Sequence, residues 1–148
     1  MEYVRTVFYY ETDQMGIVHH SNFIRWFEEA RINYLAKLGC PYDEVEKAGI
    51  ISPVLSVQCD YKNMVHFGDI VCINIRLSYF SQVKFGFEYV VEDAATGKIM
   101  ATGSSMHCFL DKDGRPVHLK RDYPQIYNVM EKEVECHNDK DSDTESIN

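Results

Sequence analysis

Hydrophobic positions change their spacing once along the chain, and this change separates a predicted helix from a predicted sheet. Over residues 21–38 the apolar side chains fall within a broad arc when each residue is turned by about 100°, which is typical of a helix wrapped by other structure. Ser21 or Asn22 would be a good N-cap, and Gly39 follows the last apolar position. The pattern predicts one long, largely buried helix.

Two charged side chains interrupt the apolar arc of this helix. Arg31 lies inside the arc and Glu28 at its border, and residues three apart are neighbours on a helix surface. The two side chains could form a partly buried ion pair that fixes the helix in place. Alternatively, one of them faces a functional site, and the sequence leaves both interpretations open.

Beyond residue 52, apolar and polar residues alternate, as in strands with one buried face. Turn sequences at 94–97 and 111–114 separate the later runs. The predicted strands are residues 3–10, 54–61, 70–79, 83–93 and 98–110. The last four are expected to form an antiparallel meander.

The order of these elements predicts an α+β fold. One helix follows the first strand and precedes the other four, and the most economical arrangement is one curved antiparallel β-sheet wrapped around the long central helix. A single sheet with one helix leaves an open strand edge and an uncovered flank. We therefore expect a homo-oligomer.

The C-terminal end differs in composition from the rest of the chain. Residues 123–135 can form an amphipathic helix, whereas residues 137–148 are acidic, which predicts a disordered tail behind a single domain over residues 1–136. From Glu131 onward, seven acidic and two basic residues contribute −5 of the formal net charge of −8, which leaves −3 for residues 1–130. The positive and negative charges of residues 1–130 are therefore nearly balanced, which argues against binding to nucleic acid or anionic membranes.

Cysteine usage and the N-terminus indicate a cytoplasmic protein. The five cysteines are odd in number and show no C-x-x-C spacing, which is typical of reduced thiols. The opening MEYVRTVFYY lacks the features of a signal peptide. No uncharged apolar run approaches the roughly 18 residues of a transmembrane helix, so no integral membrane segment is expected.

The candidate catalytic residues lie in the loop before the long helix. Asp13 has no Lys or Arg beside it in the loop, and the start of the helix presents unpaired N–H groups and a positive dipole end. Backbone N–H groups of residues 16–20 could hold an oxyanion, and Gly16 would let the backbone approach a substrate carbonyl. Asp13 could attack a thioester, deprotonate a water, or be a plain loop acid.

Other chemistries find less support in the sequence. His19 and His20 are adjacent and expected to point different ways, and no third ligand follows at a characteristic spacing, so no metal site is predicted. There is no G-x-S-x-G elbow, and the cysteines lack a basic setting. Lys62, His66 and Lys84 could meet ligand phosphates or be solvated surface charges.

The loop and the start of the helix resemble the 4-hydroxybenzoyl-CoA thioesterase family of hotdog-fold proteins. The branch most similar is that of short acyl-CoA thioesterases encoded with bacterial Tol–Pal envelope proteins, and the resemblance covers about residues 3–130. It is carried by Tyr9-x-x-Thr12-Asp13-x-x-Gly16-Ile17-Val18-x-His20-x-x-Phe23, continued by Phe27-Glu28-x-Ala30-Arg31.

The resemblance implies a hotdog fold, dimers that share an active site and often pair into tetramers, and hydrolysis of acyl-CoA thioesters without a metal or cofactor. It implies that Asp13 is a nucleophile or general base, assisted by His20, with the Tyr9 hydroxyl positioning the substrate. The implied substrate-binding residues are Gly16, Val18, His19, Ser81, Val83 and Lys84, the last three along the pantetheine arm.

Departures from the family pattern leave the acyl preference open. His19 stands where relatives often have an aromatic residue, Met15 where a small residue is common, and Met64 where a proline is frequent. An acyl-carrier-protein thioesterase, a dehydratase and a non-catalytic acyl-binding protein are the alternatives. The intact Asp13 and His20 argue against the last.

Overall fold

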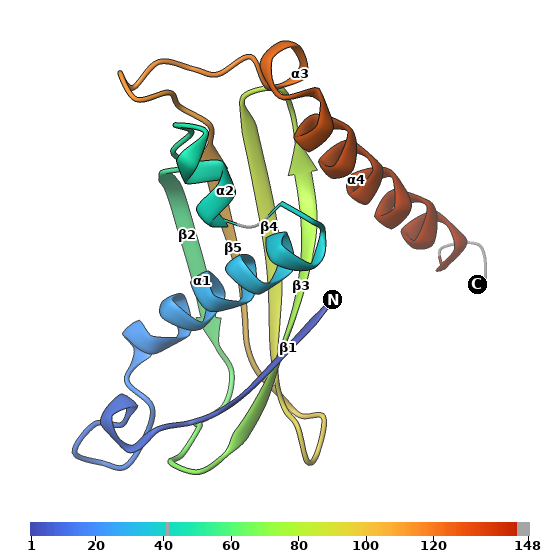
Figure 1. Cartoon of the computed structure of the whole chain (residues 1–148). Helices are drawn as coiled ribbons and strands as arrows, with labels where there is room; N and C mark the ends of the chain where they lie inside the picture. The colour runs from blue at the N-terminus through green and yellow to red at the C-terminus, as the bar shows by residue number, and fades with distance from the viewer. Residues whose placement is uncertain (41, 145–148) are drawn as a thin grey trace.

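Five antiparallel strands form one sheet that curves around the helix α1 in the computed structural model, which describes residues 1–40 and 42–144 (Figure 1). The strands are β1 (Glu2–Thr6), β2 (Val54–Tyr61), β3 (Ile70–Phe80), β4 (Lys84–Asp93) and β5 (Ile99–Cys108). The helices are α1 (His20–Lys37), α2 (Tyr42–Lys47), α3 (Leu119–Asp122) and α4 (Pro124–Thr144), with a 3-10 turn η1 (Tyr9–Glu11). The predicted α+β hotdog fold is confirmed.

The strand order corrects the predicted meander. The sheet runs β1-β3-β4-β5-β2, so β3, β4 and β5 form a meander, whereas β2 pairs with the far side of β5. Residues 62–69 carry the chain from β2 to the other side of the sheet. Alternation marks which residues face the core and not which strands pair, so the sequence did not show that β2 is an edge strand.

Aromatic side chains of α1 form the contact between helix and sheet. The Phe27 ring stacks on that of Tyr89 in β4, with 4.2 Å between centroids and 10° between planes. Gly103 in β5 makes room for this ring, because a Cβ there would lie 2.5 Å from Phe27 Cε2. Phe23, Trp26, Phe27, Ala30 and Tyr34 of the helix are buried. The sheet is thereby fixed against α1, whose N-terminal end leads back to the Asp13 loop.

Two segments differ from the predicted elements. The first strand ends at Thr6, and residues 9–11 form η1 instead of continuing the strand. Helix α4 runs to Thr144, past the predicted end at residue 135, so residues 137–144 of the predicted disordered tail have helical backbone, and residues 145–148 lie outside the described residues. Because helix propagation adds one hydrogen bond per residue, a helix nucleated on packed residues can extend through polar ones.

Helix α4 is anchored on the core by Met130, which is buried, and by a hydrogen bond of 2.8 Å from the Tyr34 hydroxyl to Glu133 Oε2. Burial, together with this carboxylate, raises the pKa of Tyr34, so the hydroxyl remains a donor. No helix within residues 1–40 and 42–144 combines the length and the apolar content needed to cross a membrane.

Candidate active site

The Asp13 carboxylate is held by its own loop. Its Oδ1 accepts hydrogen bonds from the backbone N–H groups of Met15, at 2.8 Å, and Ile17, at 3.2 Å. Gly16, at a φ of 75°, forms the turn that directs these two N–H groups toward the carboxylate. The second oxygen, Oδ2, accepts no hydrogen bond in the part of the chain that the structure describes. Oδ1 therefore fixes the orientation of the carboxylate, and Oδ2 remains available to react with a substrate or a water.

Glu11 ties both ends of this loop to α1. Its side chain is buried and accepts hydrogen bonds from Arg5 Nη2 and Trp26 Nε1, each at 2.7 Å, and from the Phe8 N–H at 2.9 Å. Its backbone oxygen accepts from the His19 N–H, at 2.9 Å, and from Asn22 Nδ2, at 2.8 Å. Glu11 was not among the predicted site residues. The available signal was an acidic residue in the otherwise apolar run after Val7.

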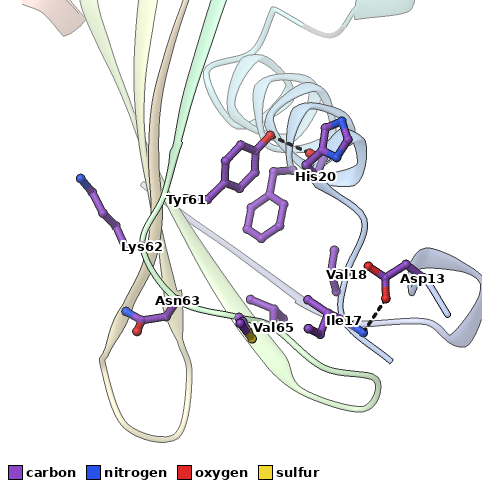
Figure 2. Close-up of a pocket in the computed structure, with 10 residues that line it drawn as sticks. Asp13, Ile17, Val18, His20, Tyr61, Lys62, Asn63 and Val65 are labelled. Carbon is purple, nitrogen blue, oxygen red and sulfur yellow. Dashed lines mark hydrogen bonds between the residues drawn. The ribbon is translucent and has the colours of Figure 1, made fainter. Parts of the chain in front are cut away.

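A cavity of about 400 Å³, the first cavity, opens beside Asp13 (Figure 2). It lies between the start of α1 and the segment that follows β2. Its lining residues are Asp13, Ile17, Val18, His20, Phe23, Tyr61, Lys62, Asn63, Met64 and Val65. Asp13, Val18 and His20 were predicted site residues, and the structure brings these three together.

Tyr61, at the end of β2, lines the first cavity and was not among the predicted site residues. Its hydroxyl donates to the His20 carbonyl at 2.8 Å (Figure 2). Its ring lies edge-on to that of Phe23, with 5.1 Å between centroids. Burial, helped by a hydrogen bond with the Cys59 thiol, raises the pKa of Tyr61 to about 12, so the phenol stays protonated near neutral pH. No feature of the sequence pattern distinguishes this tyrosine from other strand aromatics.

Most of the predicted oxyanion donors are already in use. The N–H of Gly16 donates to the Asp13 carbonyl, and that of Ile17 donates to Asp13 Oδ1. The N–H of Val18 donates to the Val65 carbonyl at 2.8 Å, and that of His19 donates to the Glu11 carbonyl. The prediction of donors over residues 16–20 is therefore wrong for the first four. The His20 N–H, at the first residue of α1, has no acceptor among the described residues.

His19 caps α1 and does not line the first cavity. Its Nδ1 accepts a hydrogen bond from the Ser21 N–H at 3.3 Å, so His19 is the N-cap in place of the predicted Ser21 or Asn22. The rings of His19 and His20 lie 4.1 Å apart, against the prediction that they point different ways. A histidine side chain can cap a helix because its deprotonated ring nitrogen accepts a hydrogen bond.

Several other predicted substrate contacts lie outside this cavity. Tyr9 is 76% exposed, with its ring edge-on to Phe67 at 5.7 Å, and Gly16 is exposed on the loop. The β3–β4 turn lies at the end of the sheet opposite the Asp13 loop (Figure 1). Ser81 and Val83 lie in this turn, and Lys84 is the first residue of β4. Their predicted roles, like those of Tyr9, Gly16 and His19, remain predictions.

The ion pair between Glu28 and Arg31, one of the two interpretations that the sequence left open, is absent from the described residues. Arg31 Nη1 donates instead to the Tyr89 hydroxyl at 3.0 Å. Glu28 and Arg31 both line a second cavity, of about 70 Å³, beside β4 and β5. Arg31 thus pairs with the Tyr89 hydroxyl on β4, and not with the Glu28 carboxylate that the sequence spacing suggested.

Known proteins with a similar sequence or structure point to one kind of chemistry. Residues 7–134 match the family described as the thioesterase-like superfamily. A protein of Aquifex aeolicus named "putative esterase" is 36% identical over 84% of this chain and 94% of its own length. One of Bacillus subtilis named "putative acyl-CoA thioesterase YneP" is 32% identical over 84% of this chain and 90% of its own length. The structure of DHNA-CoA thioesterase from Staphylococcus aureus covers 94% of this chain and 93% of its own, with a TM-score of 0.88 and 31% identity.

Proposed function

We infer that this chain, a thioester hydrolase that belongs to the thioesterase-like superfamily, hydrolyses acyl-CoA with the Asp13 carboxylate as its reacting group. The observation that supports this role is the position of Asp13. One carboxylate oxygen is held by two backbone N–H groups, and the other is left on the wall of a cavity shared with His20.

Two routes are open to this carboxylate. As a nucleophile, Asp13 would attack the thioester carbonyl carbon, the C–S bond would break, CoA would leave as the thiolate, and water would then cleave the mixed anhydride. As a general base, it would take a proton from a water that attacks the same carbon. Both routes consume one water and yield a carboxylic acid and free CoA thiol. In both, the carbonyl oxygen becomes negative and the unpaired His20 N–H at the start of α1 is a donor for it.

Aromatic acyl-CoAs lead the proposed substrates, followed by short and medium acyl chains. The Staphylococcus aureus relative is named for DHNA-CoA, that is, 1,4-dihydroxy-2-naphthoyl-CoA. The lining of the first cavity includes apolar Ile17, Val18 and Phe23. The closer resemblance to the Tol–Pal branch remains a prediction.

We further propose that two copies of the chain form a homodimer and that two such dimers pair into a tetramer. Strand β2 is an edge strand, and its Val54, Leu55 and Val57 are between 39% and 52% exposed. An apolar, unpaired edge of this kind favours pairing with a second copy. The proposed contacts of the β3–β4 turn with the pantetheine arm depend on such a copy, because within one chain the turn is remote from Asp13.

Thiol release from a panel of acyl-CoAs tests the function. We expect the Asp13→Asn variant to lose at least about 100-fold in kcat while its circular dichroism spectrum is unchanged. Asp113→Asn, in an exposed turn, makes the same chemical change away from the cavity and is the matched control. Offering the same acyl group on CoA and on acyl carrier protein identifies the carrier. Full activity in Asp13→Asn, or no thiol release by the wild type from any acyl-CoA, would overturn the proposal.

A further inference from the structure

Tyr61 extends from the end of β2 to the start of α1, along the wall of the first cavity (Figure 2). Its hydroxyl donates to the His20 carbonyl at 2.8 Å. Its ring lies edge-on to the His20 imidazole, with 6.4 Å between centroids and 86° between planes. One side chain therefore contacts both the backbone and the ring of a residue that lines the cavity beside Asp13.

The partners of the Tyr61 hydroxyl fix the direction of its hydrogen bonds. A carbonyl only accepts, so the phenol proton points to His20. The Cys59 thiol, two residues earlier on the same face of β2, is hydrogen-bonded to the same hydroxyl, and burial raises the pKa of this thiol. The protonated thiol then donates to the phenol oxygen, because the phenol proton is already in use. Two partners thus hold the hydroxyl in one orientation.

The orientation of His20 matters because its N–H is a donor without a partner. At the start of α1, the Ser21 N–H donates to His19 Nδ1, and the Asn22 N–H donates to the His19 carbonyl. The His20 N–H has no acceptor in the part of the chain that the structure describes. In a helical residue the N–H and the C=O point in opposite directions along the axis. A contact that fixes the His20 carbonyl therefore also fixes the direction of its N–H.

Hydrogen bonds on both sides hold the His20 backbone in place. On the loop side, the Val18 N–H donates to the Val65 carbonyl at 2.8 Å, which fixes the chain two residues before His20. On the helix side, the Tyr61 hydroxyl fixes the His20 carbonyl itself. The first bond connects the loop to the segment after β2, and the second connects α1 to β2.

We propose that Tyr61 is a positioning residue for thioester hydrolysis and acts through His20. Its hydroxyl directs the His20 N–H to the substrate oxygen that becomes negative in the transition state, and its ring orients the His20 imidazole in the cavity that Asp13 also lines. A displacement of about 1 Å in such a group can cost about 100-fold in rate. This inference rests on the proposed function, in which the His20 N–H is a donor for the oxyanion.

The fold itself depends little on the Tyr61 hydroxyl. Tyr61 is 47% exposed, and the His20 carbonyl, at the first residue of α1, keeps the hydrogen bond that it accepts within the helix. Tyr61→Phe therefore leaves no buried carbonyl unpaired. The ring of the variant keeps the edge-on contacts with His20 and Phe23. The substitution thus removes the hydroxyl and retains the aromatic wall of the cavity.

Steady-state kinetics of Tyr61→Phe test the proposal on the acyl-CoA that the wild type hydrolyses fastest. We expect kcat to fall about tenfold or more while KM changes by less than about twofold. The reason is that a misdirected N–H loses an interaction that forms in the transition state, which lowers kcat and kcat/KM alike. A hydroxyl that only contacted the bound substrate would instead raise KM and leave kcat unchanged.

Tyr123→Phe is the matched control. The Tyr123 hydroxyl also donates to a backbone carbonyl, that of Ala48, at 3.1 Å, and neither residue lines the first cavity. This variant should keep the wild-type kcat and KM, whatever its urea midpoint. An unchanged kcat in Tyr61→Phe, or an equal fall in both variants, would overturn the proposal.

Infrared spectroscopy of a bound analogue reports on the donor without turnover. The probe is a ketone analogue of the same acyl-CoA, with a methylene group between the sulfur and a ¹³C-labelled carbonyl, so that it has no thioester bond to hydrolyse. A hydrogen bond to a carbonyl oxygen lowers its stretching frequency. We expect the band to lie at higher frequency in Tyr61→Phe than in the wild type and in Tyr123→Phe. The same frequency in all three proteins would contradict the role of Tyr61.

Thiol release separates this proposal from the thioesterase assignment. A wild type that releases thiol from no acyl-CoA would overturn the proposed function, and with it the role of Tyr61. Thiol release at the wild-type kcat in Tyr61→Phe would overturn the role of Tyr61 alone and leave the proposed function standing.

Discussion

Two polar clusters lie against α1, and they differ in whether their donors are satisfied. In the Glu11 cluster, formed by Arg5, Glu11 and Trp26 with the Phe8 N–H, one buried carboxylate accepts three hydrogen bonds and neutralises one guanidinium. In the Arg31 chain, which runs through the hydroxyls of Tyr89 and Ser105 to His107, the guanidinium donates to the Tyr89 hydroxyl. No carboxylate among the described residues lies within ion-pair distance of this guanidinium.

The difference separates a cluster that holds the fold from one that contributes less to it. A buried charge that is fully paired and hydrogen-bonded specifies one arrangement of the chain, here that of the Asp13 loop against α1. Arg31 is only half-buried, so water can accept from the N–H groups that do not meet Tyr89. The first cluster therefore supports the site, and the fold depends less on the second.

The largest effect expected from this comparison is on the Glu11 cluster. Glu11→Ala should lower the free energy of unfolding by about 3–5 kcal/mol, because Arg5 and the Trp26 N–H lose their buried acceptor. Urea unfolding followed by tryptophan fluorescence measures it, since Trp26 is the single tryptophan. Glu46→Ala, on the exposed side of α2, is the control and should change stability by less than about 0.5 kcal/mol. A loss below about 1 kcal/mol in Glu11→Ala would show that the cluster does not hold the loop.

The sequence was sufficient for features whose signal repeats along the chain. It did not reveal individual strand neighbours or hydrogen-bond partners. The periods of the apolar residues were enough to predict α1 and the four later strands. The motif around Asp13 was enough to predict a site shared by Asp13, Val18 and His20. The pairing of β2 with β5 was missed because alternation carries no information about neighbours.

The same limit explains the errors within the site. The N–H groups of Gly16 to His19 were expected to be free because their acceptors, in Glu11, Asp13 and Val65, depend on how the loop folds back. Spacing paired Arg31 with Glu28 on its own helix, whereas the partner chosen by the fold is Tyr89, 58 residues away. Long-range hydrogen bonds of this kind leave no periodic trace in a sequence.

An effect of intermediate size concerns the pH dependence of stability. The pKa of His107 is lowered to about 4 in the folded chain, below the value of about 6.5 in an unfolded one, so the unfolded state takes up a proton first as pH falls. The wild type should lose up to about 3 kcal/mol between pH 6.5 and 4, and no more from this group below that range.

The His107→Phe variant isolates this contribution. His107 lines the second cavity together with the charged residues Arg31 and Glu28, and both of these remain in the variant. Urea unfolding of the two proteins from pH 7 to 4 should give curves that converge as the pH falls. Parallel curves would show that the pKa of His107 is the same in the folded and the unfolded state.

The smallest effect is the sharpest test of the comparison between the clusters. Arg31→Met should change the free energy of unfolding by less than about 1 kcal/mol, because the guanidinium has no carboxylate to lose and the Tyr89 hydroxyl keeps Ser105 as its partner. Arg5→Met, the same substitution in the Glu11 cluster, should cost about 3–5 kcal/mol, since it leaves a buried carboxylate unpaired. Equal losses in the two variants would mean that Arg31 serves the fold. A small loss for Arg31→Met beside a large one for Arg5→Met would show that the fold depends on the Glu11 cluster and not on Arg31.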